Sequence, residues 1–263
     1  MTPLKRTWLT VDFDDLRHVP SAQGHPTRSK RPVAGKQLSE PYTSAMKSFE
    51  AWLDTTMHAV TLFVIADLFE SNEFGEWFNA LLAKHGERLT VGCHGLTHRS
   101  WSAWPEDRDG FGTSLERATA VLKEKAGGHF RPWFRAPAGY IAPWMATTLA
   151  TQGYAVDSSV NPSWLVRKKA GKGNSWSDVN DAMAQSGVLE RPWATRFSLP
   201  VNGPALTRFP LSVIAKGAWK KAPSVLASDE LDAAVSDSTQ PLVTLYWHVL
   251  DHARNGAAWT PPL

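Results

Sequence analysis

The feature that most constrains the fold is a repeated alternation of apolar runs with segments of helical periodicity. Short apolar runs rich in β-branched and aromatic residues lie at positions 7–13, 59–65 and 88–93, and such runs are typical of buried strands. Between and after them, helical segments are predicted at 43–57, 73–86 and 114–125. This alternation predicts right-handed β-α units on a parallel sheet.

The second half of the chain is less regular. We expect a strand and loop at 132–139, a helix at 143–152, a strand at 154–157, a loop at 168–178, a strand at 208–214, a short helix at 228–235 and a strand at 241–247. The polar stretch 16–41, with six Pro and Gly residues, is expected to be a long loop. No linker divides the 263 residues, so residues 1–263 are expected to form one α/β domain of barrel size.

Acids and histidines follow the predicted strands. Asp14 and Asp15 end the first strand, His94 follows the third, and His248 follows the last. The C-terminal edge of parallel strands is where ligands bind in barrels and in open sheets. His94 and His98 are four residues apart, so on a helical turn both rings face one way and can hold one divalent ion. The histidine pair alone fits a solvated surface equally well.

Composition excludes several classes of protein. The chain is 43% hydrophobic and 20% charged, with a net charge of +3, as in an ordinary soluble protein. Its basic runs at 167–172 and 216–221 are too short for a nucleic-acid footprint and are expected to be solvated. Cys93 is the only cysteine, so no internal disulfide forms, and a buried strand residue is expected there rather than a nucleophile. Without an apolar leader or membrane-length run, we expect a cytoplasmic protein.

Five short motifs occur in a recognisable order along the chain. They are Asp12-Phe-Asp-Asp15, His94-x3-His98, Arg135-Ala-Pro-Ala-Gly139, Asp157-Ser-Ser and Tyr246-Trp-His248. Their order resembles that of the polysaccharide deacetylases, carbohydrate esterase family 4, also called the NodB-like homology domain. The resemblance spans residues 7 to about 250. It implies a distorted (β/α) barrel and metal-dependent hydrolysis of acetyl groups on sugars.

The resemblance also implies a metal site. The family's acidic motif reads Thr-Phe-Asp-Asp and matches residues 12–15, with Asp12 in the place of the threonine. Carried over, Asp14 would be the general base, and Asp15 would be a metal ligand together with His94 and His98. Zinc is the first expectation for this ligand set, and Co²⁺, Ni²⁺ and Fe²⁺ also suit it.

Further roles come from the same resemblance. Arg135 would pair with the base, and His248 would be the general acid, oriented by Asp157 or by another acid. The backbone N–H of Ala138 would help to bind an oxyanion. Gly139 and Trp164 would lie on the substrate side, where a tryptophan can stack on a sugar ring.

The chain departs from the family pattern at a few positions. Gly95 stands where the residue after the first metal histidine is normally Ser or Thr, and Val160 stands where the fourth motif has a second acid. The acid expected directly after the last histidine is absent, and Asp251 follows two positions later than Val249.

These residues lead to an expected function with two alternatives. We expect a metal-dependent hydrolase that removes an N-acetyl group from an amino sugar in a glycan or glycan precursor. A deformylase or other amidase on the same scaffold, or a non-catalytic carbohydrate-binding relative, remains open. Taken singly, each residue also fits a structural role: Asp14 and Asp15 as a turn, Arg135 as an ion pair, His248 as a core residue.

Overall fold

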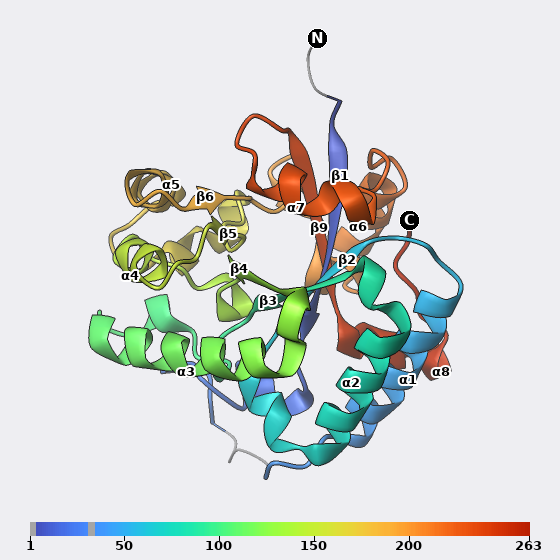
Figure 1. Cartoon of the computed structure of the whole chain (residues 1–263). Helices are drawn as coiled ribbons and strands as arrows, with labels where there is room; N and C mark the ends of the chain where they lie inside the picture. The colour runs from blue at the N-terminus through green and yellow to red at the C-terminus, as the bar shows by residue number, and fades with distance from the viewer. Residues whose placement is uncertain (1–3, 31–34) are drawn as a thin grey trace.

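Seven parallel strands form the centre of the molecule. The computed structural model describes residues 4–30 and 35–263 (Figure 1). Its main sheet has the order β6-β5-β4-β3-β2-β1-β9. The strands are β1 (Arg6–Phe13), β2 (Val60–Val64), β3 (Leu89–Cys93), β4 (Phe130–Phe134), β5 (Val156–Asp157), β6 (Leu189–Glu190) and β9 (Leu242–His248). The sheet curls with helices around its outside (Figure 1), so the expected distorted (β/α) barrel is confirmed.

The barrel closes through a narrow seam between β6 and β9. After β6 the chain forms a single parallel bridge from Trp193 to Thr244, and Ala194 N donates to Thr244 O at 3.0 Å. The Asn202 amide donates to Ala194 O and Thr244 O, at 3.2 and 3.3 Å. A two-stranded hairpin, β7 (Thr195–Arg196) and β8 (Leu199–Pro200), lies within this segment. The closure therefore rests on one bridge and one side chain instead of a full ladder.

The alternation of side chains along β1 separates two apolar regions. Leu9, Val11 and Phe13 belong to the large core between the sheet and the outer helices. Trp8 belongs to a smaller cluster, where its ring meets those of Phe63 and Trp133 edge-on. Because successive strand residues point to opposite faces, the even-numbered residues of β1 face the interior of the barrel. Asp12 follows Trp8 and Thr10 on that interior side.

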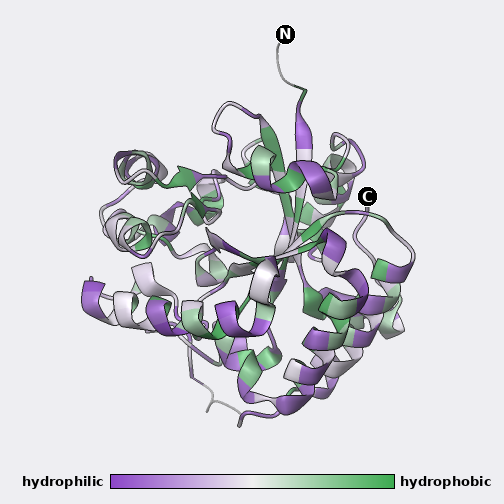
Figure 2. Ribbon diagram, viewed as in Figure 1, coloured by the Kyte–Doolittle hydropathy of each residue, from purple (hydrophilic) through white to green (hydrophobic). Residues whose placement is uncertain are grey.

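Eight α-helices with intervening 3-10 turns complete the described chain. The α-helices are α1 (Glu40–Asp54), α2 (Asn72–His85), α3 (Arg108–Ala126), α4 (Met145–Thr151), α5 (Trp176–Gln185), α6 (Leu211–Trp219), α7 (Ser228–Ser236) and α8 (Arg254–Ala257). Apolar and polar residues alternate around the outer helices (Figure 2), and α1 buries Phe49 and Leu53 against the core. Within the residues described, no helix combines the length and apolar character that a membrane span requires.

The expected elements agree with the structure through residue 160 and diverge later. The predicted strands at 7–13, 59–65, 88–93 and 241–247 are confirmed as β1, β2, β3 and β9. The predicted strand at 208–214 is wrong, because α6 occupies residues 211–219. The buried residues of α6 are Ala215 and Trp219, one helical turn apart. Both lie beyond the apolar run at 208–214, so that run alone did not indicate a helix. The loop expected at 168–178 contains the start of α5.

Candidate active site

The C-terminal end of β1 brings two carboxylates to the same face. Asp12 and Asp14 are two positions apart, so the pleat of an extended chain points both into the barrel. Both side chains are buried. Asp12 Oδ1 accepts a hydrogen bond from Arg135 at 2.7 Å, and Asp14 lies against three histidines. Two acids at this edge therefore have different partners and different chemistry.

Asp14 forms a compact group with the two predicted histidine ligands. Its Oδ1 lies 3.4 Å from His94 Nε2, and its Oδ2 lies 3.6 Å from His98 Nε2. One potential ligand atom from each residue lies within 4.8 Å of the others. No described residue donates a hydrogen bond to Asp14 Oδ1. Burial raises the pKa of this carboxyl, although the nearby His94 lowers it. A buried carboxylate oxygen without a donor is suited to a cation.

The two histidines present lone pairs toward Asp14. His94 Nδ1 lies 2.8 Å from Arg135 O, and a ring N–H donated to this carbonyl leaves Nε2 free to bind a metal. Burial, followed by the charge of His94, holds the pKa of His98 well below its usual value. Gly95 between them has φ +95°, and a Cβ there would lie 3.0 Å from Thr97 O. Glycine at the position where the family has a hydroxyl therefore permits this ligand loop.

Asp15, the ligand expected from the motif match, lies elsewhere. Its side chain caps the 3-10 turn Leu16–His18, where it accepts from Leu16 N at 2.5 Å. It also accepts from Ser39 N at 3.0 Å and from the Ser39 hydroxyl. Since β1 ends at Phe13, the chain turns at Asp15 and directs this carboxylate toward the start of α1. The structure thus brings Asp14, and not Asp15, together with His94 and His98.

Arg135 pairs with Asp12 instead of Asp14. The guanidinium is fully buried and also donates to Thr10 Oγ1 at 2.8 Å, Ser158 O at 2.9 Å and Ser158 Oγ at 3.0 Å. Its Cζ lies 4.2 Å from the centre of the Phe63 ring. With donors used on four oxygens and an aromatic face beneath it, the guanidinium has a fixed position. Asp12 was not among the residues predicted for the site, although its spacing of two from Asp14 indicates a shared face.

His248 lies on the other side of Asp14, with Asp251 as its acidic partner. Its Nε2 is 3.9 Å from Asp14 Oδ2, and its Nδ1 is 3.8 Å from Asp251 Oδ2. Burial disfavours the imidazolium, but Asp251 and Asp14 outweigh this effect and raise the pKa of His248 to about 9. The ring is 24% exposed, so it can exchange protons with solvent. The sequence left open whether Asp157 or another acid orients His248, and the structure places Asp251 beside it.

The loop after β4 carries the expected oxyanion donor. Ala138 adopts φ +50° and ψ +20°, a left-handed conformation that costs a non-glycine residue free energy and recurs at functional sites. Its carbonyl accepts from Lys169 Nζ at 2.6 Å. Gly139 follows with φ +68°, where a Cβ would lie 2.8 Å from the Trp193 ring. Trp164 begins the 3-10 segment that contains Lys169 and is 62% exposed, so its ring is accessible to a ligand.

Asp157 belongs to a buried carboxyl pair with Glu190. The two residues are paired across β5 and β6. Asp157 Oδ1 accepts from Ser159 Oγ at 2.7 Å, and Glu190 Oε1 accepts from Val160 N at 3.2 Å. The remaining oxygens, Asp157 Oδ2 and Glu190 Oε2, have no donor among the described residues. Burial and the neighbouring Asp157 raise the pKa of Glu190 well above its usual value. Burial likewise raises the pKa of Asp157, so both shifts favour a protonated carboxyl in this pair.

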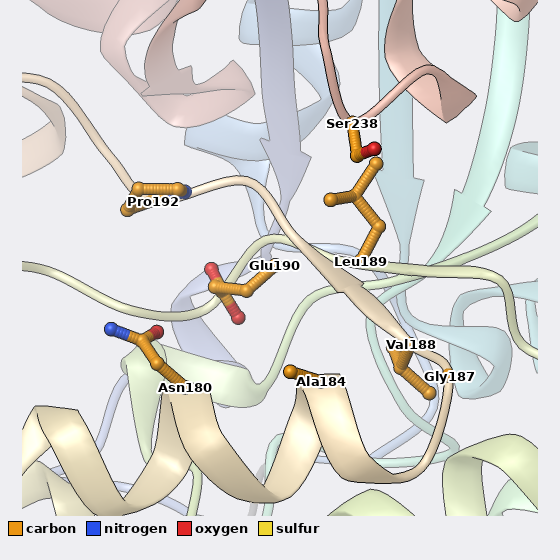
Figure 3. A pocket seen from close by; sticks show the side chains of 8 residues that line it. All are labelled: Asn180, Ala184, Gly187, Val188, Leu189, Glu190, Pro192 and Ser238. Carbon is orange, nitrogen blue, oxygen red and sulfur yellow. The ribbon is translucent and has the colours of Figure 1, made fainter.

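Glu190 also lines a hollow between α5 and β6 (Figure 3). The hollow has a volume of about 470 Å³, and Asn180 and Ser238 contribute polar groups to its wall. None of the residues grouped around Asp14 lines it. Asp157 is thus tied to the far edge of the sheet, and its link to the site is structural: it holds Ser159, whose hydroxyl accepts from Ala136 N at 2.8 Å.

Replacement of Glu190 by Gln is expected to flatten the pH dependence of stability. In the folded protein the pair retains a proton that the unfolded chain loses above pH of about 4.5. The unfolding free energy of the parent protein therefore falls as pH rises above that value, by up to about 1.4 kcal/mol per pH unit, until the pair ionises. In Glu190→Gln this contribution is missing. Chemical denaturation between pH 5 and 8 measures the difference.

The exposed Glu116 on α3 provides the control for that measurement. Glu116→Gln removes the same charge from a solvated position, and its pH dependence should match that of the parent protein. Equal slopes for Glu190→Gln and the parent would show that the pair holds no shared proton.

Cys93 is a buried strand residue, as expected. It is fully buried at the end of β3, and burial raises the pKa of its thiol to about 11. Its sulfur accepts from Gly95 N at 3.3 Å. A buried thiol with a raised pKa is a poor nucleophile and a poor metal ligand at neutral pH. Its hydrogen bond from Gly95 N helps to hold the loop between His94 and His98.

With this geometry established, comparison with known proteins defines a class for the fold. No family model matches the chain, and no curated protein matches its sequence. Among solved structures, 98% of the chain superposes on 81% of a putative polysaccharide deacetylase from Mycobacterium smegmatis, with a TM-score of 0.58 and 20% identity. The chain therefore has the polysaccharide deacetylase fold, and the resemblance expected from its motifs is confirmed at that level.

Two further structures share the fold over a smaller part of their own length. The carbohydrate deacetylase Agd3 matches 99% of this chain over 47% of its own, with a TM-score of 0.50 and 12% identity. The 4-alpha-glucanotransferase from Thermococcus litoralis matches 96% of this chain over 34% of its own, with a TM-score of 0.50 and 11% identity. Since one fold carries both hydrolysis of acyl groups and glucan transfer, the activity has to be argued from the site.

Proposed function

We propose that this protein is a metal-dependent deacetylase that hydrolyses the N-acetyl group of an amino sugar. The observation that carries the proposal is the Asp14, His94 and His98 group, flanked by the Asp12–Arg135 pair on one side and His248 on the other. These are the parts that amide hydrolysis needs: a cation site, a base and an acid. The deacetylases that share the fold support the substrate class.

The residues of the group fit a divalent metal. Two neutral imidazoles and one carboxylate form a three-ligand set that leaves room for water and substrate, as in catalytic zinc sites. The Asp14 Oδ1 atom, which has no donor among the described residues, lies 3.4 Å from the free Nε2 of His94. When bound, the metal would polarise the acyl oxygen and lower the pKa of water to about 7. Zinc is our first choice, and the same donors suit Co²⁺, Ni²⁺ and Fe²⁺.

Asp12 is the proposed general base. Its Oδ1 is held by Arg135, while its Oδ2 lies 4.0 Å from His94 Nε2 and so faces the ligand group. A water between Asp12 and the scissile carbonyl would give its proton to Oδ2 as it attacks. The guanidinium balances the carboxylate charge and fixes its orientation, which is the role that the sequence assigned to Arg135 with Asp14.

His248 is the proposed general acid. Its imidazolium form is favoured by Asp251, whose other oxygen accepts from Arg254 at 2.8 Å. A protonated ring beside Asp14 can donate to the nitrogen that leaves as an amine, which is a poor leaving group unless it is protonated. The Ala138 N–H, on a loop held by Lys169, would bind the developing oxyanion.

A panel of acylated sugars tests this function. We expect the purified protein, loaded with Zn²⁺, to release acetate from N-acetylated amino sugars or their oligomers and to stop when a chelator removes the metal. Acetate is measured by a coupled assay, and formate is measured in parallel on N-formyl sugars. Formate without acetate would favour a deformylase. Release of neither, with sugar binding retained in calorimetry, would indicate a carbohydrate-binding protein.

A further inference from the structure

A cluster of basic side chains lies beside the candidate metal ligands. The loop after β1 passes directly over His98, because Gln23 Oε1 accepts from His98 N at 2.8 Å and Ser100 N donates to Gly24 O at 2.9 Å. The next residue on this loop is His25. Its position is therefore fixed by backbone contacts to the segment that carries the second histidine ligand.

His25 meets two other loops at Tyr140. The His25 Nε2 and Tyr140 Oη atoms are 3.1 Å apart, and Lys169 Nζ lies 5.4 Å from the centre of the Tyr140 ring. Lys169 donates to Ala138 O, two residues before Tyr140, and Lys169 O accepts from Ser102 Oγ at 2.5 Å. Polar groups from three separate segments thus converge next to the proposed oxyanion donor.

The charges around this cluster are all positive. Burial, then Arg28 and Lys169, lowers the pKa of His25, and burial, then Arg28, lowers the pKa of Lys169 to about 8. No described carboxylate forms an ion pair with His25, Arg28 or Lys169; the nearby Arg99, by contrast, pairs with Asp107 at 3.8 Å. The lowered pKa makes His25 a neutral hydrogen-bonding group, and Arg28 is exposed, so the cation that most needs a counter-charge is the half-buried Lys169.

The sequence shows the same imbalance over both loops. Residues 16–39 contain no Asp or Glu and five basic residues, Arg17, Arg28, Lys30, Arg31 and Lys36. Residues 158–177 contain no Asp or Glu and four basic residues, Arg167, Lys168, Lys169 and Lys172. Arg17 and Lys36 form ion pairs with Asp67 and Glu70, outside the segment, whereas no ion pair with a described carboxylate involves Arg28 or Lys169.

We propose that His25, Tyr140 and Lys169 form a subsite that binds an anionic substituent, a phosphate or a carboxylate, carried by the amino sugar, and that the exposed Arg28 adds its charge to this subsite. This inference rests on the proposed function and narrows its substrate class to acidic sugars. Lysine, arginine and a phenol are the donors that phosphate and carboxylate groups accept from. A neutral sugar would leave the Lys169 ammonium without a counter-charge, although it donates to Ala138 O, so an anionic sugar is the better complement.

Matched substrates test the subsite in turnover. We expect kcat/KM to be at least about 10-fold higher for an anionic sugar than for N-acetylglucosamine, as one charge-assisted contact gives. N-acetylglucosamine 1-phosphate supplies the phosphate arm, and N-acetylmuramic acid supplies the carboxylate arm. Arg28→Ala should shrink this preference mainly through KM. Lys169→Met should shrink it too, and should also lower kcat because Ala138 loses its anchor.

Lys220, exposed at the end of α6, gives a control of equal charge change. Lys220→Ala should keep the preference, since it lies outside the cluster. A preference that survives both Arg28→Ala and Lys169→Met, or equal turnover of neutral and anionic sugars by the parent protein, would overturn the subsite.

Calorimetry separates the subsite from the deacetylase proposal. Glucose 1-phosphate and glucuronate, which have no acyl group, should bind the parent protein more tightly than glucose, and one or both should lose affinity in Arg28→Ala. If no acetylated sugar is turned over but this binding is seen, the anionic subsite stands and the activity is refuted. If neutral acetylated sugars are turned over and neither anion binds better than glucose, only the subsite is refuted.

Discussion

Asp14→Asn is expected to abolish metal binding, whereas Asp15→Asn is expected to keep it. Among the described residues, Asp14 is the carboxylate that forms a group with both His94 and His98, whereas Asp12, 4.0 Å from His94 Nε2, is not part of that group. A neutral amide is a poor ligand for zinc. We expect the parent protein and Asp15→Asn to hold about one metal ion per chain, and Asp14→Asn to hold none. Deacetylation by Asp14→Asn should fall by about three orders of magnitude or more, as the loss of both metal functions implies.

Elemental analysis of the purified variants, with zinc titration by calorimetry, measures this difference. Asp15→Asn should instead lower the unfolding free energy by about 1–3 kcal/mol, since an amide cannot accept from all the partners of Asp15 at the start of α1. Metal retained by Asp14→Asn and lost by Asp15→Asn would restore the ligand assignment that the motif match implies. Thermal unfolding shows whether either variant has simply failed to fold.

Asp12→Asn is expected to separate catalysis from metal binding. Its amide cannot take a proton from water, so kcat should fall by about 10²–10⁴, while the Asp14 group keeps its metal. KM should change far less than kcat, because Asp12 is proposed to act on the attacking water. Steady-state kinetics on the best acetylated sugar, with metal analysis of the same sample, checks both halves of this expectation.

Thr10→Val is the control for damage to the Arg135 network. Arg135 donates to Thr10 and to Asp12 from the same nitrogen. Thr10→Val removes one acceptor from the buried guanidinium, and Asp12→Asn keeps an acceptor oxygen but removes the counter-charge, so both should lower stability. Only Asp12→Asn should lose most of its turnover. Comparable losses of kcat in the two variants would mean that Asp12 acts by holding Arg135, and the base would have to be sought elsewhere.

The sequence could place most of the site because strand ends define it. Apolar runs identified β1, β3 and β9, and their C-terminal ends necessarily meet at one edge in a parallel sheet. His94, His98 and His248 could therefore be brought together before any coordinates. The hydrogen bonds of Arg135 with Ser158 and Thr10 were beyond such reasoning, because they join loops and strands distant in the sequence.

The acids of the first motif show where pattern matching fell short. Matching letters placed the family's two acids on Asp14 and Asp15, whereas the pleat of a strand puts Asp12 and Asp14 on one face. The alternation from Trp8 through Thr10 to Asp12 was readable in the sequence, and it indicates the register that the structure has. Asp251 was readable too, since it lies three residues beyond His248 on a turn.

The barrel wall consists of continuous strand ladders from β6 through β1 to β9 and of a short seam that joins β6 back to β9. In a fully closed barrel, strand number and stagger together fix the circumference. Here the circumference is completed by the Trp193–Thr244 bridge and by Asn202, outside the ladders that position Asp12, His94 and His248. The hairpin of β7 and β8, between residues 195 and 200, can therefore change in length or path without altering the register of β1, β3 and β9. Trp193, which packs against Gly139, and Asn202, which accepts from Tyr246 N, instead tie the two ends of this segment to the site and to β9.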